Sequence, residues 1–156
     1  MSTVTLDQAE RIIDAILARG RELDFRPLAV VVTNIGAHVT AFKKDDGSAM
    51  MRFEMAMGKA YAALALGRSS SLVRERAEER PLFMGYLMRA AEGRIFAEGG
   101  GMLIRNDHCE VIGAVGVTGE TEERDEGLAA HGIRSAGLKT DEDCARLGKR
   151  VRLTNK

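Results

Sequence analysis

The sequence predicts an α+β fold in which one antiparallel sheet is covered by helices. Two pairs of short, β-rich apolar runs each enclose a turn, at residues 28–43 and 102–118, and therefore predict two hairpins. Segments with a helical spacing of apolar residues precede, separate and follow the hairpins. The order helix, hairpin, helices, hairpin, helix favours an antiparallel sheet over a parallel one.

Four elements are expected in the first half of the chain. A capping box at Thr5–Gln8 and the apolar stripe behind it predict the first helix, and Gly67 at a C′ position ends the last one. Pro27 and the turn residues 34–37 delimit the strands between them. The expected elements are a helix from Thr5 to Leu23, strands Leu28–Thr33 and His38–Lys43, and a helix from Met50 to Leu66.

The second half is expected to contain three more helices and two strands. Ser69–Ser71 can cap one helix, and Pro81 can open the next because proline is tolerated in a first helical turn. Thr121 is a candidate N-cap for the last of the three. The expected elements are helices 69–79, 81–89 and 121–136 and strands 102–105 and 109–118. Residues 1–138 are thus expected to form one domain, and 139–156 a polar C-terminal extension.

Regularly spaced glycines mark the second strand of the second hairpin. Gly113, Gly116 and Gly119 recur at every third residue, so glycine lies on alternating faces and another backbone or a ligand can approach closely. The spacing is not G-x-G-x-x-G, so a dinucleotide-binding fold is not indicated. A central strand, apolar on both faces, is favoured.

Composition narrows the class of protein. Lys plus Arg total 23 and Asp plus Glu total 23, so the net charge is zero. The overall charge therefore does not indicate binding to nucleic acid or to an anionic membrane. No segment approaches the ~20 apolar residues of a membrane span, and the N-terminus lacks the pattern of a signal peptide. Cys109 and Cys144 are too few for a disulfide scaffold or a zinc site. We expect reduced thiols and a cytoplasmic protein with a small-molecule or protein partner.

Two charged residues stand where helices should be apolar. Lys59 shares a helix face with Met55 and Ala63, and Asp125 leads the apolar stripe of the last long helix. A buried ammonium must be paired or lower its pKa, so Lys59 could bind a carboxylate ligand, pair with Asp125 or act as a base. Alternatively, the aliphatic part of the Lys59 side chain packs on the core while its ammonium group reaches solvent. Asp125 could equally complement the helix dipole or form an ion pair at a subunit interface.

Four blocks of sequence resemble the GlcG/HbpS family of haem-binding-like proteins. They read V-V-T-N-I-G-A-H-V-T-A-F-K-K-D-D-G (31–47), G-K-A-Y-A-A-L-A-L-G-R (58–68), G-G-G-M-L-I (99–104) and I-G-A-V-G-V-T-G-E-T-E-E-R-D-E (112–126). The resemblance covers residues 3–136 and implies a profilin-like, five-stranded antiparallel sheet flanked by helices. It also implies a homo-oligomer, either a dimer, a tetramer or an octamer. Some family members bind haem, which makes haem the candidate cofactor.

The resemblance also points to site residues. His38 matches a position where many members have histidine, so it is the candidate axial ligand of haem iron or a general base. The alternative is a strand-end histidine that faces solvent. The family loop P-G-G-x-P reads E-G-G-G-M at Glu98–Met102, without either proline, so a more flexible loop with an added carboxylate is expected.

Two functions are compatible with these residues. The first is a protein that binds haem or a small organic acid between the Lys59 helix, the His38 hairpin and the Gly99–Gly101 loop. The second is a catabolic enzyme in which Lys59 or His38 moves a proton, in an isomerisation, elimination or hydrolysis, while Asp125 or Glu98 orients the partner. The candidate ligand-binding residues are His38, Met55, Lys59, Glu98, Gly99, Gly100 and Gly101, and the catalytic candidates are Lys59, His38 and Asp125.

Overall fold

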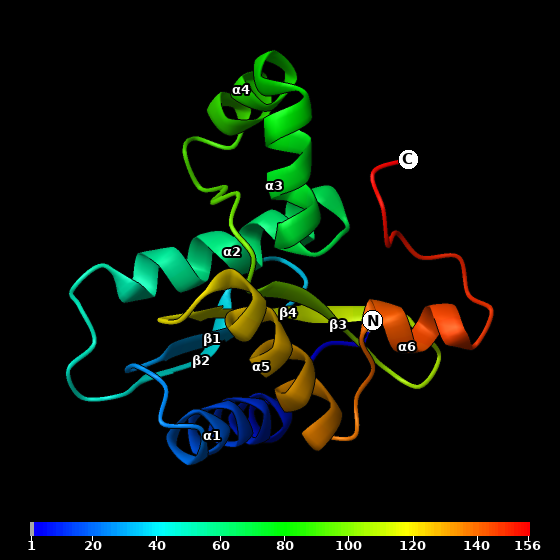
Figure 1. The fold of residues 1–156 in the computed structure, drawn as a ribbon. Coiled ribbons are helices and arrows are strands. Elements are labelled where there is room, and N and C mark those ends of the chain that lie inside the picture. The colour runs from blue at the N-terminus through cyan, green and yellow to red at the C-terminus, as the bar shows by residue number, and fades with distance from the viewer. Residues whose placement is uncertain (1) are drawn as a thin grey trace.

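A four-stranded antiparallel sheet forms the central layer of the computed structural model, which describes residues 2–156 (Figure 1). The two predicted hairpins lie side by side, and every neighbouring pair of strands is antiparallel. The α+β class is therefore confirmed. In spatial order the strands are β2 (Val39–Lys44), β1 (Ala29–Thr33), β4 (Val111–Thr118) and β3 (Gly101–Arg105).

The expectation of five strands is wrong, because residues 2–156 form four. After the last long helix the chain returns to the outer edge of β3, where Lys139 and Arg105 make one isolated antiparallel bridge. Thr140 then caps the short helix α6 (Asp141–Arg146). The backbone turns into a helix directly after the bridge, so the pairing on this edge cannot extend into a strand.

Helices cover both faces of the sheet (Figure 1). α1 (Leu6–Glu22) and α5 (Glu122–Ser135) pack together on one face, and α2 (Arg52–Leu66) packs on the other. Side chains of β1 alternate between the two layers as the period of a strand requires. Val30 and Val32 belong to the α1–α5 core, whereas Val31 contacts the Ala-rich face of α2.

Glycines in β4 let the layers come close. A Cβ atom added at Gly116 would overlap the carbonyl oxygen of Ala56 on α2, and one at Gly113 would overlap that of Thr33 on β1. Both overlaps are with backbone, which cannot rotate away. The prediction of a central strand approached closely by neighbouring backbone is confirmed.

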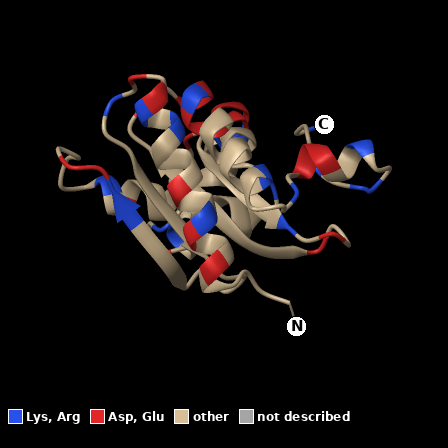
Figure 2. Cartoon of the chain, turned by 90° about the horizontal axis from the view of Figure 1, so that it is seen from below, with Lys and Arg blue, Asp and Glu red and all other residues tan. Residues whose placement is uncertain are grey.

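Two further helices extend away from the sheet beyond α2 (Figure 1). These are α3 (Ser70–Glu79) and α4 (Pro81–Ala90), and they form a small separate core with one face of α2. None of the helices in residues 2–156 is long and apolar enough to cross a membrane. Figure 2 shows Lys and Arg interspersed with Asp and Glu over the chain, whose totals are equal.

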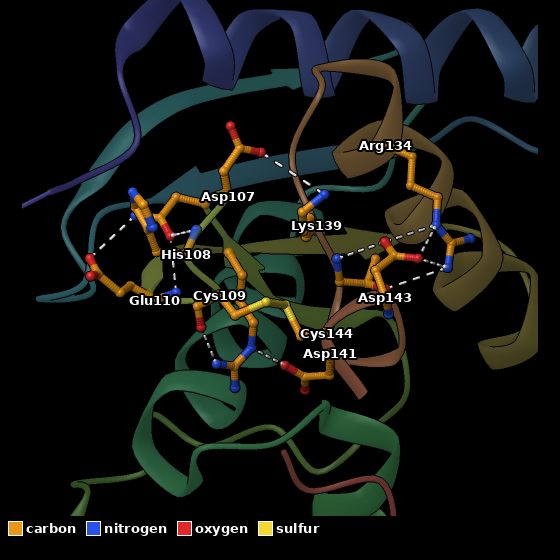
Figure 3. The surroundings of a disulfide bond; sticks show 12 residues. Asp107, His108, Cys109, Glu110, Arg134, Lys139, Asp141, Asp143 and Cys144 are labelled. Atoms are coloured by element: carbon orange, nitrogen blue, oxygen red, sulfur yellow. Dashed lines mark hydrogen bonds and ion pairs between the residues drawn. A yellow bond between two sulfur atoms is a disulfide. The ribbon is translucent and has the colours of Figure 1, made fainter. Parts of the chain in front are cut away.

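The two cysteines form a disulfide, so the expectation of reduced thiols is wrong (Figure 3). Cys109 lies in the turn between β3 and β4, and Cys144 lies on α6. Their Cα atoms are 5.8 Å apart although 35 residues separate them in the sequence. The Arg105–Asp141 ion pair, with Nε and Oδ1 2.6 Å apart, lies beside the bond. The C-terminal segment is therefore fastened to the second hairpin, a proximity that sequence spacing does not reveal.

Candidate functional site

The two charged residues that interrupt apolar helix faces meet in the structure. Lys59 on α2 is 3% exposed and Asp125 on α5 is 1% exposed. Lys59 Nζ donates to Asp125 Oδ2 at 3.1 Å and to the carbonyl oxygen of Val117 at 3.0 Å. Asp125 Oδ1 accepts from the backbone N–H of Glu120 at 3.1 Å. Of the alternatives that the sequence left open, the structure selects the pairing of Lys59 with Asp125.

Burial dominates the electrostatics of this pair. It lowers the pKa of Lys59 and raises the pKa of Asp125, because desolvation disfavours the charged form of each group. Their mutual attraction and hydrogen bond act in the opposite direction on both pKa values. A pair with this geometry holds α2 to α5, and each charge depends on the other for its compensation.

The glycine loop closes over the ion pair. Gly100 has a φ of +125°, and a Cβ there would lie 3.1 Å from both Lys59 Cδ and Asp125 Cβ. The loop is hydrogen-bonded on either side, since Gly101 N donates to Ser70 Oγ and Gly99 N donates to Glu122 Oε1, each at 2.7 Å. The absence of side chains is therefore what allows this loop to cover a buried charge pair.

The other predicted site residues lie apart from this cluster or at its margin. His38 is exposed in the turn between β1 and β2, next to the Thr33–Ala114 register position. The glycine loop lies further along β4, because the Gly100 carbonyl accepts from the N–H of Val117. Val117 is three residues from Ala114, so about 10 Å of strand separates the loop from the position next to His38. Met55 is half-buried and receives a contact from Arg52 Nη1 at 3.9 Å from its sulfur. Glu98 is half-buried and adds to the negative potential at Lys59.

An apolar pocket of about 300 Å³ lies on a different face of α2, and the sequence reasoning missed it. Three of its residues are spaced four apart on α2, namely Phe53, Met57 and Tyr61, and that spacing is the signal that could have found it. Phe96 closes the pocket by packing directly over Gly58. Only glycine leaves room for it there, because a Cβ atom added at Gly58 would lie 2.6 Å from Phe96 Cβ. Neither His38 nor the Gly99–Gly101 loop lines this pocket.

The chemistry of the pocket suits a flat apolar ligand that carries an acidic group. Most of its side chains are aromatic or thioether groups, which offer stacking surfaces and adaptable contacts, and Glu54 adds one carboxylate to the lining. Arg94 is the cation at its margin, with Cζ 4.7 Å from the centre of the Tyr61 ring, where it could pair with a carboxylate. Within residues 2–156, no group of three or more His, Cys, Asp or Glu side chains could hold a metal ion.

Comparison with known families places most of the chain in one of them. The family described as haem degrading protein HbpS-like matches residues 4–134. An uncharacterized 15.0 kDa protein from the dhaT-dhaS intergenic region of Citrobacter freundii is 29% identical over 130 residues, which are 83% of this chain and 89% of that protein.

Solved structures share the fold at low sequence identity. Klebsiella pneumoniae ORFY superposes with a TM-score of 0.80 at 24% identity, covering 88% of this chain and 92% of that one. A PduOC–haem complex gives 0.79 at 20% identity, over 88% of this chain and 98% of PduOC. HbpS gives 0.74 at 18% identity, over 86% and 90% of the respective chains. The family match stops at residue 134, before the C-terminal extension.

Proposed function

Because the chain belongs to the HbpS-like family, as the match over residues 4–134 shows, we propose that it is a small-ligand-binding protein that holds haem or a small organic acid. The resemblance read from the four sequence blocks is thereby confirmed. The observation that carries the proposal is the aromatic pocket on α2, with Arg94 at its margin. The haem complex of PduOC, which shares the fold, supports haem as the first ligand to test.

The residues of this pocket fit a haem group. Tyrosine and methionine are both known axial ligands of haem iron, and the pocket offers Tyr61 and Met57. Phe53 and Phe96 would contact the porphyrin face, and Arg94 would pair with a propionate. Bound haem would supply an iron centre able to bind a small ligand or exchange electrons. His38 remains a proposed iron ligand, but its exposed turn would reach the haem only from a neighbouring subunit.

Haemin titration, followed by the Soret band, tests this proposal. We expect a shifted Soret band in the wild type that is lost in Tyr61→Phe or Met57→Leu, depending on which residue ligates the iron. Arg94→Gln should weaken binding roughly tenfold, because it removes a charge-assisted hydrogen bond. Met50→Leu, at an exposed position before α2, is the matched control for Met57→Leu and should bind as the wild type does.

Other outcomes would change the proposal. Loss of the Soret shift in His38→Ala, with binding retained in Tyr61→Phe and Met57→Leu, would move the iron to the β1–β2 turn. Absence of any shift in the wild type would exclude haem. Benzoate would then serve as a probe for the organic-acid alternative, with Arg94→Gln expected to abolish its stabilisation of the protein against heat.

The enzymatic alternative has less support. A proton-transfer role for Lys59 or Asp125 needs an approach path for a substrate, yet both are almost fully buried. Both hydrogen-bond to protein groups, and Gly100 covers them. His38 has access to solvent, but it lies past the end of β1 that is farther from Lys59 and Asp125. The structure therefore favours binding over catalysis by this set.

We also propose that the protein forms a homo-oligomer through its projecting helices. Leu82 is 93% exposed and Tyr86 is 65% exposed, both on α4. Large apolar side chains gathered on one helix are typical of a contact surface. Light scattering on a size-exclusion column should give a multiple of the 17.0 kDa chain mass, and Leu82→Glu should reduce it. A monomeric wild type would contradict this proposal.

A further inference from the structure

A basic pocket of about 550 Å³ lies between the end of α2, α3 and the C-terminal tail 150–156. In Figure 1 the tail rises beside α3, and the contact is made by Asn155, whose Nδ2 donates to the carbonyl oxygen of Leu72 at 2.8 Å. The charged residues that line this pocket are Arg68, Arg76, Arg150, Arg152 and Lys156.

The lining of this pocket is basic, and the Glu75 carboxylate lies at its edge, where Oε2 accepts from Asn155 Nδ2 at 3.4 Å. No Asp or Glu is among the residues that line it, and none of its five cations forms an ion pair within residues 2–156. Most of the cations outside the pocket lie next to a carboxylate, as Arg74 does beside Glu78 at 3.0 Å. Clustered like charges repel one another and destabilise the tail position unless an anion is bound.

Arg68 in this pocket is buried, and Arg76 is half-buried with a buried Nε. Arg68 is 7% exposed, and its Nη1 donates to Asn155 Oδ1 at 2.6 Å. Burial, together with the charges of Arg152 and Arg76, lowers the pKa of Arg68. The Nε of Arg76 is buried and has no hydrogen-bond partner in residues 2–156. A buried donor without a partner costs free energy, which a bound acceptor would recover.

From these observations we propose that the pocket binds a small oxyanion carrying two or more negative charges. Guanidinium groups present planar pairs of N–H donors that match phosphate and carboxylate oxygens, and this pocket has four of them. Its volume exceeds what a single phosphate needs, so a phosphorylated or polycarboxylate molecule fits the space. This site is separate from the aromatic pocket, with which it shares no lining residue.

The site is a property of the C-terminal extension. Arg150, Arg152 and Lys156 all lie beyond residue 134, where the family match ends. Arg68 and Arg76 come from within the family domain. Asn155 joins the two parts, since its side chain binds Arg68, Leu72 and Glu75. The extension therefore converts two family-domain arginines into a site with five cations.

Calorimetric titration with pyrophosphate and with citrate, at fixed ionic strength, tests the proposal and separates the two sources of oxyanion. The pocket variant is R150Q/R152Q. The matched control is R146Q/K149Q, which removes the same charge from exposed positions of the same segment that do not line the pocket. We expect binding of at least one probe by the wild type and by the control, and roughly tenfold or greater weakening in the pocket variant.

A third variant separates site geometry from total charge. Asn155→Ala keeps every charge but removes the contacts that hold the tail against α3, so it should also weaken binding. Equal weakening in the pocket variant and in R146Q/K149Q would mean unspecific attraction and would overturn the proposal. So would a wild type that binds neither probe. Haemin binding should be unchanged in R150Q/R152Q, so this test does not depend on the function proposed for the aromatic pocket.

Discussion

Lys59 Nζ lies 3.1 Å from Asp125 Oδ2, and this buried ion pair joins helices that cover opposite faces of the sheet. It lies where β4 ends and the glycine loop crosses, so it fixes α2, α5 and the loop relative to one another. We interpret it as a structural pair that does not line the aromatic pocket, which leads to the first prediction.

Removal of one partner of the pair should destabilise the fold strongly. Lys59→Met leaves the Asp125 carboxylate buried without its cation, which typically costs about 3–5 kcal/mol of the free energy of unfolding. Asp125→Asn should have a similar effect through the unpaired ammonium. Urea unfolding followed by circular dichroism measures both.

A double variant and an exposed pair serve as controls. Lys59→Met combined with Asp125→Leu removes both charges and should cost clearly less than the sum of the single variants. Lys43→Met breaks the exposed pair with Asp14, whose Nζ–Oδ1 distance is 2.9 Å, and should leave unfolding unchanged. Single Lys59 and Asp125 variants as stable as the wild type would contradict the structural role.

Gly116→Ala should destabilise the fold. The new methyl group would overlap the backbone carbonyl of Ala56, so α2 would have to move off the sheet. We expect a loss of at least the ~1–3 kcal/mol typical of overpacked cores. Gly127→Ala is the control, because no atom lies within 4 Å of its added Cβ. It should stabilise α5 by roughly 0.5–1 kcal/mol. Thermal and urea unfolding of the two variants should therefore differ in sign.

Reduction of the Cys109–Cys144 disulfide should loosen the C-terminal segment. The bond closes a loop of 35 residues, for which the chain-entropy relation gives about 4 kcal/mol of stabilisation. Dithiothreitol should lower the melting temperature of the wild type, and C109S/C144S should melt at that lower temperature with or without reductant. Two titratable thiols in the native, unreduced protein would contradict the bond.

Stability should fall in acid through Glu120. Its carboxylate accepts the backbone N–H of Arg26 at 2.9 Å and pairs with Arg124 at 3.1 Å, and these contacts lower its pKa from 4.5 to about 2. The folded pKa lies below the unfolded one, so the stabilisation is complete above about pH 4.5 and is lost as the pH falls toward about 2. Glu120→Gln should show a smaller decrease across this range when unfolding is measured at each pH. An identical decrease in both proteins would exclude Glu120 as a source.

Much of the fold was predictable from local signals. The Thr5–Gln8 capping box is present, Gly67 ends α2 in the left-handed region with φ 65°, and both hairpins form near their predicted positions. These features depend on residues close in sequence, where propensity and capping act directly. The fifth strand was inferred from family resemblance alone. In the structure Thr140 caps a helix at the sheet edge, and no fifth strand forms in the described residues.

The candidate site was predictable only in part. A lysine and an aspartate on apolar helix faces signalled buried charge, because a charge at such a position needs a partner. The aromatic pocket escaped notice because its α2 residues read as an ordinary apolar stripe until Phe96 and Arg94 are placed against them.

The sequence by itself determined the class of fold, the order of the elements and the residues whose charge had to be compensated. These follow from periodicity, capping and the cost of burying charge, which act along the chain. Only the tertiary structure decided that Lys59 pairs with Asp125, that Cys109 bonds to Cys144 and that five cations share one pocket. The disulfide and the ion pair join residues 35 and 66 positions apart, and the pocket joins Arg68 and Arg76 to the C-terminal tail. These distances are set by how the sheet and helices pack.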